Sequence, residues 1–169
     1  VSSFLQRMPP TIAPALMEAH GLQPQMIGYF SASNICGSIV FLVMGAPLLR
    51  RFGSVRSLQI GLCLGALGAL VFMLPFTPLL IMGTVLMGLG YGPSTPAGSD
   101  ILQRHAPARH RVLIFSVKQA GVPAGGILAG LLLPQLIDIG GLDLCLLACF
   151  LFAGATAMLI TPYRRLDPP

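Results

Sequence analysis

Charged residues are scarce in this 169-residue chain. Asp, Glu, Lys and Arg together make up 9% of it, whereas an ordinary soluble domain carries about 25%. A water-soluble globule could not be covered with so few charges. Hydrophobic residues make up 54% of the chain, its mean hydropathy is +0.82, and the charges cluster in short loops between long apolar runs. This pattern is typical of successive membrane-spanning helices in a lipid bilayer.

Tryptophan is absent and aromatic residues make up 7% of the chain, so no aromatic belt marks the membrane interfaces and charge has to place them. The formal net charge is +5, and nucleic-acid binders also carry an excess of positive charge. Such proteins concentrate their basic residues on a solvated face or arm, whereas here the basic residues lie in loops between apolar runs. We therefore expect no nucleic-acid partner.

The common signatures of enzymes and metal sites are missing. The chain has no GxSxG, HExxH or GxxxxGK[ST] motif, and His20, His105 and His110 fall in loops on opposite sides of the predicted membrane. The cysteines form no CxxC pair, and all lie in apolar segments: Cys36, Cys63, Cys145 and Cys149. We interpret them as small buried hydrophobic residues. We expect no metal, no cofactor and no enzymatic activity.

The apolar runs predict an all-α, polytopic membrane protein in a single domain over residues 1–169. The predicted spans are 4–17, 26–48, 57–75, 78–99, 113–136 and 143–161. Each complete span is close to the roughly 20 residues needed to cross the hydrocarbon core, and none shows the period-two alternation of a membrane strand. The first run resembles the second half of a span, so we expect further chain upstream.

Arginines occupy every second loop of this prediction. They follow the second, fourth and sixth spans, at Arg50, Arg51, Arg56, Arg104, Arg109, Arg111, Arg164 and Arg165. The other loops contain no Lys or Arg, and their charged residues are Glu18, Asp138 and Asp143. Because positively charged loops stay in the cytoplasm, the arginine-bearing loops are predicted to be cytoplasmic.

Glycine and proline are abundant, with 20 and 15 residues. Small residues let helices approach closely in lipid, and the fifth span carries two rows of them. These predicted packing residues are Gly121, Pro123, Gly125, Gly126 and Gly130. Prolines at 9, 10 and 14 and at 93 and 96 remove backbone donors, which predicts kinks in the first and fourth spans.

Arg7 is the most informative single residue. It lies about ten residues before the outer end of the first span, near the bilayer midplane, where a charge is costly and normally faces a cavity or a partner. In one interpretation Arg7 contacts an anionic substrate or a buried carboxylate. In the other, the span is shifted and Arg7 extends to the cytoplasmic surface.

Other polar residues of the spans allow two interpretations each. Tyr91, Thr95 and Ser99 share one face of the fourth span, and Tyr29, Ser33 and Asn34 lie in the second. These groups either join helices or line a polar cavity. The position of Lys118 in the fifth span favours a structural role with its amine extending to the surface, and Asp100 could pair with Arg50, Arg51 or Arg104.

The loop LLRRFGSVR resembles the loop signature of the major facilitator superfamily, G-x-L-x-D-R-x-G-x-R. Arg51, Gly53 and Arg56 fit it, whereas Arg50 stands where the family usually has Asp. Asp100 is a candidate for the missing negative charge. Residues 115–134, FSVKQAGVPAGGILAGLLLP, resemble the fifth span of bacterial members, and residues 88–99, GLGYGPSTPAGS, are similar to the fourth.

This resemblance implies a secondary transporter of a bacterial inner membrane. The chain would be the N-terminal six-helix half of a twelve-span fold and would need a C-terminal half as partner. A small-molecule substrate would bind between the halves and cross by alternating access. The implied cavity residues are Arg7, Tyr29, Asn34, Tyr91 and Thr95, and an anionic substrate is favoured if Arg7 faces the cavity. The alternative is a non-transporting six-span subunit, or a half-size protein that dimerises.

Overall fold

The computed structural model describes residues 1–74 and 76–167, which are all-helical and contain no strand. The last residue of the predicted third span, Pro75, and residues 168–169 lie outside this description. The helices are α1 (Ser2–His20), α2 (Met26–Met44), α3 (Ala46–Phe52), α4 (Ser54–Val71), α5 (Thr77–Tyr91), α6 (Ser94–His105), η1 (Ala108–His110), α7 (Arg111–Leu159) and η2 (Thr161–Leu166).

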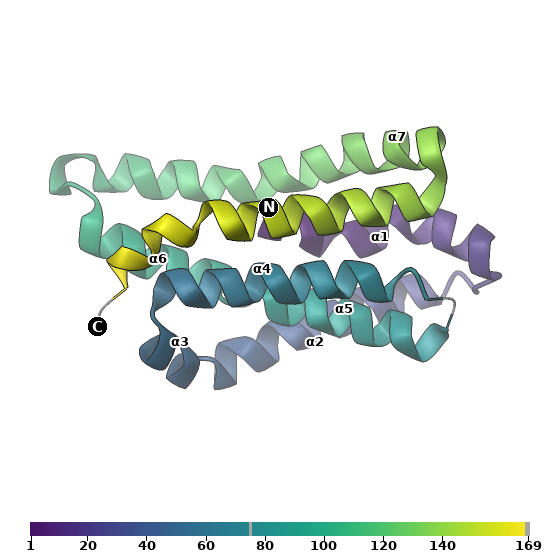
Figure 1. Ribbon diagram of the computed structural model, residues 1–169, viewed down its shortest axis with the longest axis horizontal. Coiled ribbons are helices and arrows are strands. Elements are labelled where there is room, and N and C mark those ends of the chain that lie inside the picture. Colours follow the sequence, from purple (N-terminus) through teal and green to yellow (C-terminus); the bar gives the residue numbers. More distant parts are fainter. Residues whose placement is uncertain (75, 168–169) are drawn as a thin grey trace.

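The long helices run roughly side by side in one bundle (Figure 1). Helix α5 packs on α2 and α4, and α7 packs on α1 and α4. Helices α3 and α6 lie at the same end of the bundle as the C-terminus, at the left in Figure 1. The core therefore forms where α1, α4, α5 and α7 meet.

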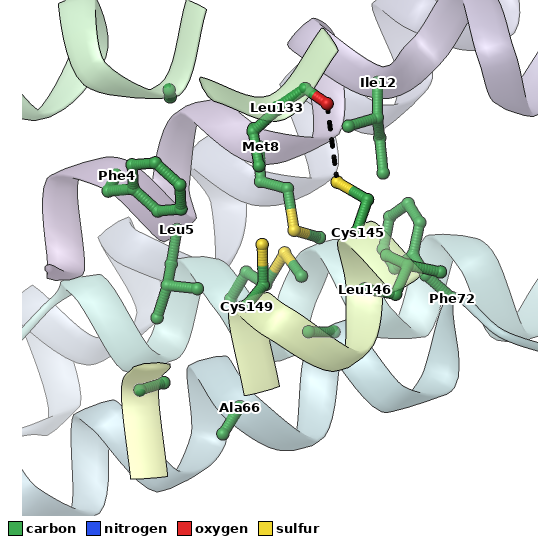
Figure 2. Packing of buried hydrophobic residues seen from close by; sticks show 14 of the residues in the cluster. Phe4, Leu5, Met8, Ile12, Ala66, Phe72, Leu133, Cys145, Leu146 and Cys149 are labelled. Carbon is green, nitrogen blue, oxygen red and sulfur yellow. Dashed lines mark hydrogen bonds between the residues drawn. The ribbon is translucent and has the colours of Figure 1, made fainter. Parts of the chain in front are cut away.

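Helix α7 is divided at Gly140 and Gly141 into a first arm, residues 111–139, and a second arm, residues 142–159. The centre of the core joins α1 to the second arm. Met8 and Ile12 of α1 are fully buried beside Cys145 and Cys149 (Figure 2). The Cys145 thiol lies 3.8 Å from the carbonyl oxygen of Leu133 in the first arm. These two cysteines are buried hydrophobic residues, as predicted.

The other two cysteines do not follow that prediction. Cys36 and Cys63 are exposed, because an apolar helix in a membrane bundle has an outward face as well as a core face, and sequence alone does not say which face a residue occupies. Large apolar side chains share this outward surface: Val112 is 82% exposed and Ile139 is 78% exposed. Such a surface suits a lipid solvent.

Among the described residues, three helical stretches are long and apolar enough to cross a membrane: Met26–Met44, Ser54–Val71 and Ala108–Arg165. The last contains two antiparallel arms, because α7 turns back at Gly140 and Gly141. Gly141 has φ 74°, a backbone conformation that favours glycine. The fold class is thus helical with membrane-spanning character, and the count of six spans stays a prediction.

Two predicted spans end differently in the structure. The second was predicted to reach residue 48, but α2 ends at Met44 and a separate short helix, α3, follows Gly45. The fourth is divided at Gly92 and Pro93 between α5 and α6, in agreement with the predicted kink. Prolines 9, 10 and 14 lie inside α1, which is one continuous α-helix.

Candidate functional site

The arginine-bearing segments gather at one end of the bundle. Ser54 at the start of α4 donates a hydrogen bond from its hydroxyl to Asp100 Oδ2 of α6 at 2.5 Å. Arg164 of η2 donates from Nε to Gln59 Oε1 of α4 at 2.5 Å. The three segments that the sequence assigns to one side of the membrane therefore lie together.

Asp100 forms an ion pair with Arg104, one turn further along α6, with 2.9 Å between Oδ1 and Nε. Of the three arginines considered for Asp100, this is the one it contacts. Arg50 and Arg56 are exposed, and the Arg51 guanidinium lies 5.6 Å from the centre of the Phe52 ring. Asp100 thus contacts the loop motif through Ser54.

A carboxylate that the sequence analysis missed secures this loop. Asp167 accepts hydrogen bonds from the backbone N–H groups of Val55, at 2.7 Å, and Arg56, at 3.0 Å. Both N–H groups belong to the first turn of α4, which has no partners within its own helix. Gly53 precedes that turn with φ 81°, and a β-carbon there would lie 2.4 Å from Asp167 Cγ. The motif glycine is therefore required for both its backbone conformation and the space it leaves.

Replacing Asp167 with alanine is expected to destabilise the bundle by about 1 kcal/mol, the usual cost of removing a helix cap. The thermal unfolding midpoint of the complete protein in detergent measures this effect. Asp143→Ala is the matched control, since Asp143 is exposed in α7 and caps no helix in the described residues. Equal midpoints for the two variants would contradict the capping role.

Arg7 lines a cavity of about 210 Å³ between α1 and α2. The other lining residues are Gln6, Pro10, Ser31, Asn34 and Ile35. The side chain also extends along the first arm of α7, because a β-carbon on Gly126 would lie 3.7 Å from Arg7 Cγ and 4.0 Å from Nε. No ion pair to Arg7 is found within residues 1–74 and 76–167. The cavity thus combines an uncompensated positive charge with neutral polar groups.

Asn34 is the one other predicted cavity residue that lines this space. It is 4% exposed, and its Nδ2 donates to the carbonyl of Thr84 in α5 at 3.3 Å. Asn34 therefore both joins α2 to α5 and borders the cavity. Tyr29 is 60% exposed, and neither it, Tyr91 nor Thr95 lines the space beside Arg7.

Lys118 joins α7 to α6. Its ammonium donates hydrogen bonds to the Thr95 carbonyl at 3.0 Å and to Ser99 Oγ at 2.6 Å. Two of the hydroxyl-bearing residues of the fourth span are thus engaged by α7.

The predicted packing residues of the fifth span occupy different surroundings. Gly125 is buried, and a β-carbon there would lie 2.9 Å from Ser3 Cβ and 3.1 Å from the Phe4 nitrogen of α1. A β-carbon on Gly121 or Gly130 would meet nothing within 4 Å, and Pro123 is exposed. In the described residues, the close approach of α1 to this arm is centred on Gly125.

Guanidinium and amide donors around a small cavity can bind a carboxylate, since arginine presents paired N–H groups that match its two oxygens. The other polar groups of the lining are the amides of Gln6 and Asn34 and the hydroxyl of Ser31, which can donate and accept hydrogen bonds.

The chain is similar to several curated transporters. It is 26% identical over 133 residues to a hexuronate transporter of Bacillus subtilis, covering 77% of this chain and 31% of that protein. It is 26% identical over 152 residues to a multidrug efflux pump of Mycolicibacterium fortuitum, covering 86% and 36%. It is 26% identical over 130 residues to a 4-hydroxybenzoate transporter of Acinetobacter baylyi, covering 73% and 28%.

The chain spans about a third of the length of these relatives. A family model described as Major Facilitator Superfamily matches residues 1–169, which is the whole chain. The chain therefore belongs to the Major Facilitator Superfamily of membrane transporters.

Proposed function

We propose that this chain is the N-terminal half of a secondary transporter for small organic anions. The observation that carries this proposal is the Arg7 cavity, where a guanidinium without a carboxylate partner lies beside Asn34 and Ser31. A charge within a membrane bundle normally has a partner or a function. An anionic substrate supplies the missing partner.

The named substrates of two relatives support this class. Hexuronate and 4-hydroxybenzoate are both small carboxylates with hydroxyl groups. A cavity with one guanidinium and several neutral polar groups suits such molecules. The carboxylate would pair with Arg7, and the hydroxyls would bind Asn34, Ser31 or Gln6.

The proposed architecture has six spans, with the arginine-rich end in the cytoplasm of a bacterial cell and the bundle in its inner membrane. The gathering of the arginine segments at one end supports this orientation. A C-terminal half would complete the substrate cavity, and rocking of the two halves would give alternating access. In that assembly the exposed Tyr29 and Thr95 and the half-buried Tyr91 would face the second half or the path between the halves.

The test is uptake by the complete transporter in proteoliposomes. We expect accumulation of labelled 4-hydroxybenzoate or glucuronate, and competition by the other carboxylates. The matched neutral compounds, 4-hydroxybenzyl alcohol and glucose, should not compete. Transport of a cationic drug with no effect of carboxylates would contradict the anion class. If no solute is transported and the protein forms a dimer of six-span chains, the half-size or subunit alternative replaces this proposal.

A further inference from the structure

Lys118 is the chain's one lysine, and its half-buried side chain lies against α6. It precedes Gly125, Ala129 and Leu133 by seven, eleven and fifteen positions, which places all four on one face of the first arm of α7. The other three are buried. Lys118 thus projects from the core-facing side of the arm, toward α6.

Helix α6 provides a fitted position for this side chain. Thr95, Gly98 and Ser99 lie three and four residues apart and form one face. The ammonium binds the Thr95 carbonyl and the Ser99 hydroxyl, while the stem crosses Gly98, where a β-carbon would lie 3.1 Å from Lys118 Cε. Helix α6 therefore offers Lys118 two hydrogen-bond acceptors and, at Gly98, the space for its stem.

Both acceptors of the ammonium are neutral. In the described part of the chain, residues 1–74 and 76–167, the ion pair found joins Arg104 to Asp100, and none involves Lys118. Lys118 therefore matches Arg7 as a cation of the bundle that has neutral partners only. A lysine ammonium has three donor positions, and two of them are used here.

An open hollow of about 890 Å³ lies between α6 and α7. Gln103, Arg111, Phe115 and Gln119 are among its lining residues. The ammonium of Lys118 lies 6.0 Å from the centre of the Phe115 ring. The hollow lies at the arginine-rich end, and two of its lining residues, Phe115 and Gln119, flank Lys118 along α7.

Arg7 lies beside the first arm of α7, and Lys118 is part of that arm at a different depth. Arg7 lies against Gly126, which is eight residues beyond Lys118, and eight residues of helix correspond to about 12 Å. Lys118 is the nearer of the two to the arginine-rich end. A carboxylate that leaves Arg7 toward that end would next meet the Lys118 ammonium.

We propose that Lys118 is a second anion-binding residue on the transport path, which receives the substrate carboxylate between the Arg7 cavity and the hollow at the arginine-rich end. This inference rests on the proposed function. In the structure the Lys118 ammonium donates hydrogen bonds to the Ser99 hydroxyl and the Thr95 carbonyl. The carboxylate replaces the Ser99 hydroxyl as it passes, and the ammonium returns to α6 afterwards.

The experiment separates the charge of Lys118 from its hydrogen bonds to α6. Lys118→Gln keeps a donor without charge, whereas Lys118→Arg keeps the charge. We would measure equilibrium binding and uptake of 4-hydroxybenzoate, with glucuronate in a parallel series, on the complete transporter in proteoliposomes. Because hydrogen bonds to a charged group are the stronger ones, we expect Lys118→Gln to slow uptake about ten- to hundredfold. Binding should change by less than about threefold, since Arg7 holds the substrate, and Lys118→Arg should retain most uptake.

Ser99→Ala provides the matched control, since it removes the hydroxyl that holds the ammonium and leaves the cation. We expect uptake by this variant to be close to that of the parent. If Lys118 only ties α6 to α7, Lys118→Gln will transport normally, or Ser99→Ala will be as slow as Lys118→Gln, and either result overturns the inference. Retained binding in Arg7→Met would instead overturn the proposed function, so the two failures are distinguishable.

Discussion

Replacing Arg7 with alanine is expected to abolish anion uptake by the complete transporter and to leave the amount of folded protein unchanged. The side chain is exposed and forms no ion pair in the described residues, so the bundle does not depend on it. A carboxylate held by two charge-assisted hydrogen bonds would lose roughly 3 kcal/mol or more without it, which corresponds to a hundredfold or greater loss of affinity.

The measurement compares initial uptake of 4-hydroxybenzoate and glucuronate with the size-exclusion profile of each purified variant. Arg109→Ala is the control, because Arg109 is an exposed arginine of the α6–α7 connection and lies away from the cavity. Arg7→Lys should recover part of the uptake, since an ammonium keeps the charge and loses the paired geometry. Normal uptake in Arg7→Ala would remove Arg7 from the substrate site.

Replacing Gly88 with alanine is expected to cause the largest loss of stability. A β-carbon there would lie 2.0 Å from the Asn34 carbonyl oxygen and 2.9 Å from its carbonyl carbon. Both atoms belong to the backbone of α2, so no side chain can turn away and the two helices must separate. Overpacking of this kind costs about 1–3 kcal/mol, and the upper end applies because the obstacle is backbone.

The thermal unfolding midpoint in detergent measures this loss. Gly28→Ala is the matched control in α2, where a new β-carbon would meet nothing within 4 Å, and its midpoint should equal that of the parent or exceed it. The Gly88 variant should also bind substrate more weakly. Separation of α2 from α5 breaks the hydrogen bonds of Asn34 to Thr84 and of Ser38 to the Gly88 carbonyl, and Asn34 borders the Arg7 cavity. A Gly88 variant as stable as Gly28→Ala would contradict the close approach of the two helices.

The helical class and the grouping of the arginines could be predicted from the sequence, because both follow from local composition. Hydropathy identifies apolar stretches, and charge separates the two ends of the bundle. The rotation of each helix about its axis could not be predicted. Gly121 and Gly125 have the same spacing pattern, yet Gly125 meets α1 and Gly121 meets open space. Gly88 gave no stronger signal than either, although its contact is the closest of the three.

Contacts between distant segments escaped the sequence analysis for a related reason. Asp167 was passed over because a single carboxylate after a run of arginines has no distinctive pattern, and its partners lie more than one hundred residues earlier. The contacts of Lys118 with Thr95 and Ser99 were not predicted, because the depth of a side chain in a span can be counted from the sequence and its direction around the helix cannot. Arg7 could be selected from the sequence because a charge far inside an apolar span is unusual; the structure places it beside a cavity, and its role as a substrate contact stays a prediction.

The cap that Asp167 places on α4 has a consequence for biosynthesis. The Val55 N–H group donates to a carboxylate that is 112 positions later in the chain. A ribosome adds about 5–20 residues per second. The first turn of α4 therefore stays uncapped for on the order of ten seconds while α5, α6 and α7 are made and inserted. Closing this contact is among the last steps in assembling the bundle, so the Val55 and Arg56 amide hydrogens should exchange faster in a nascent chain stalled before residue 167 than in the finished bundle.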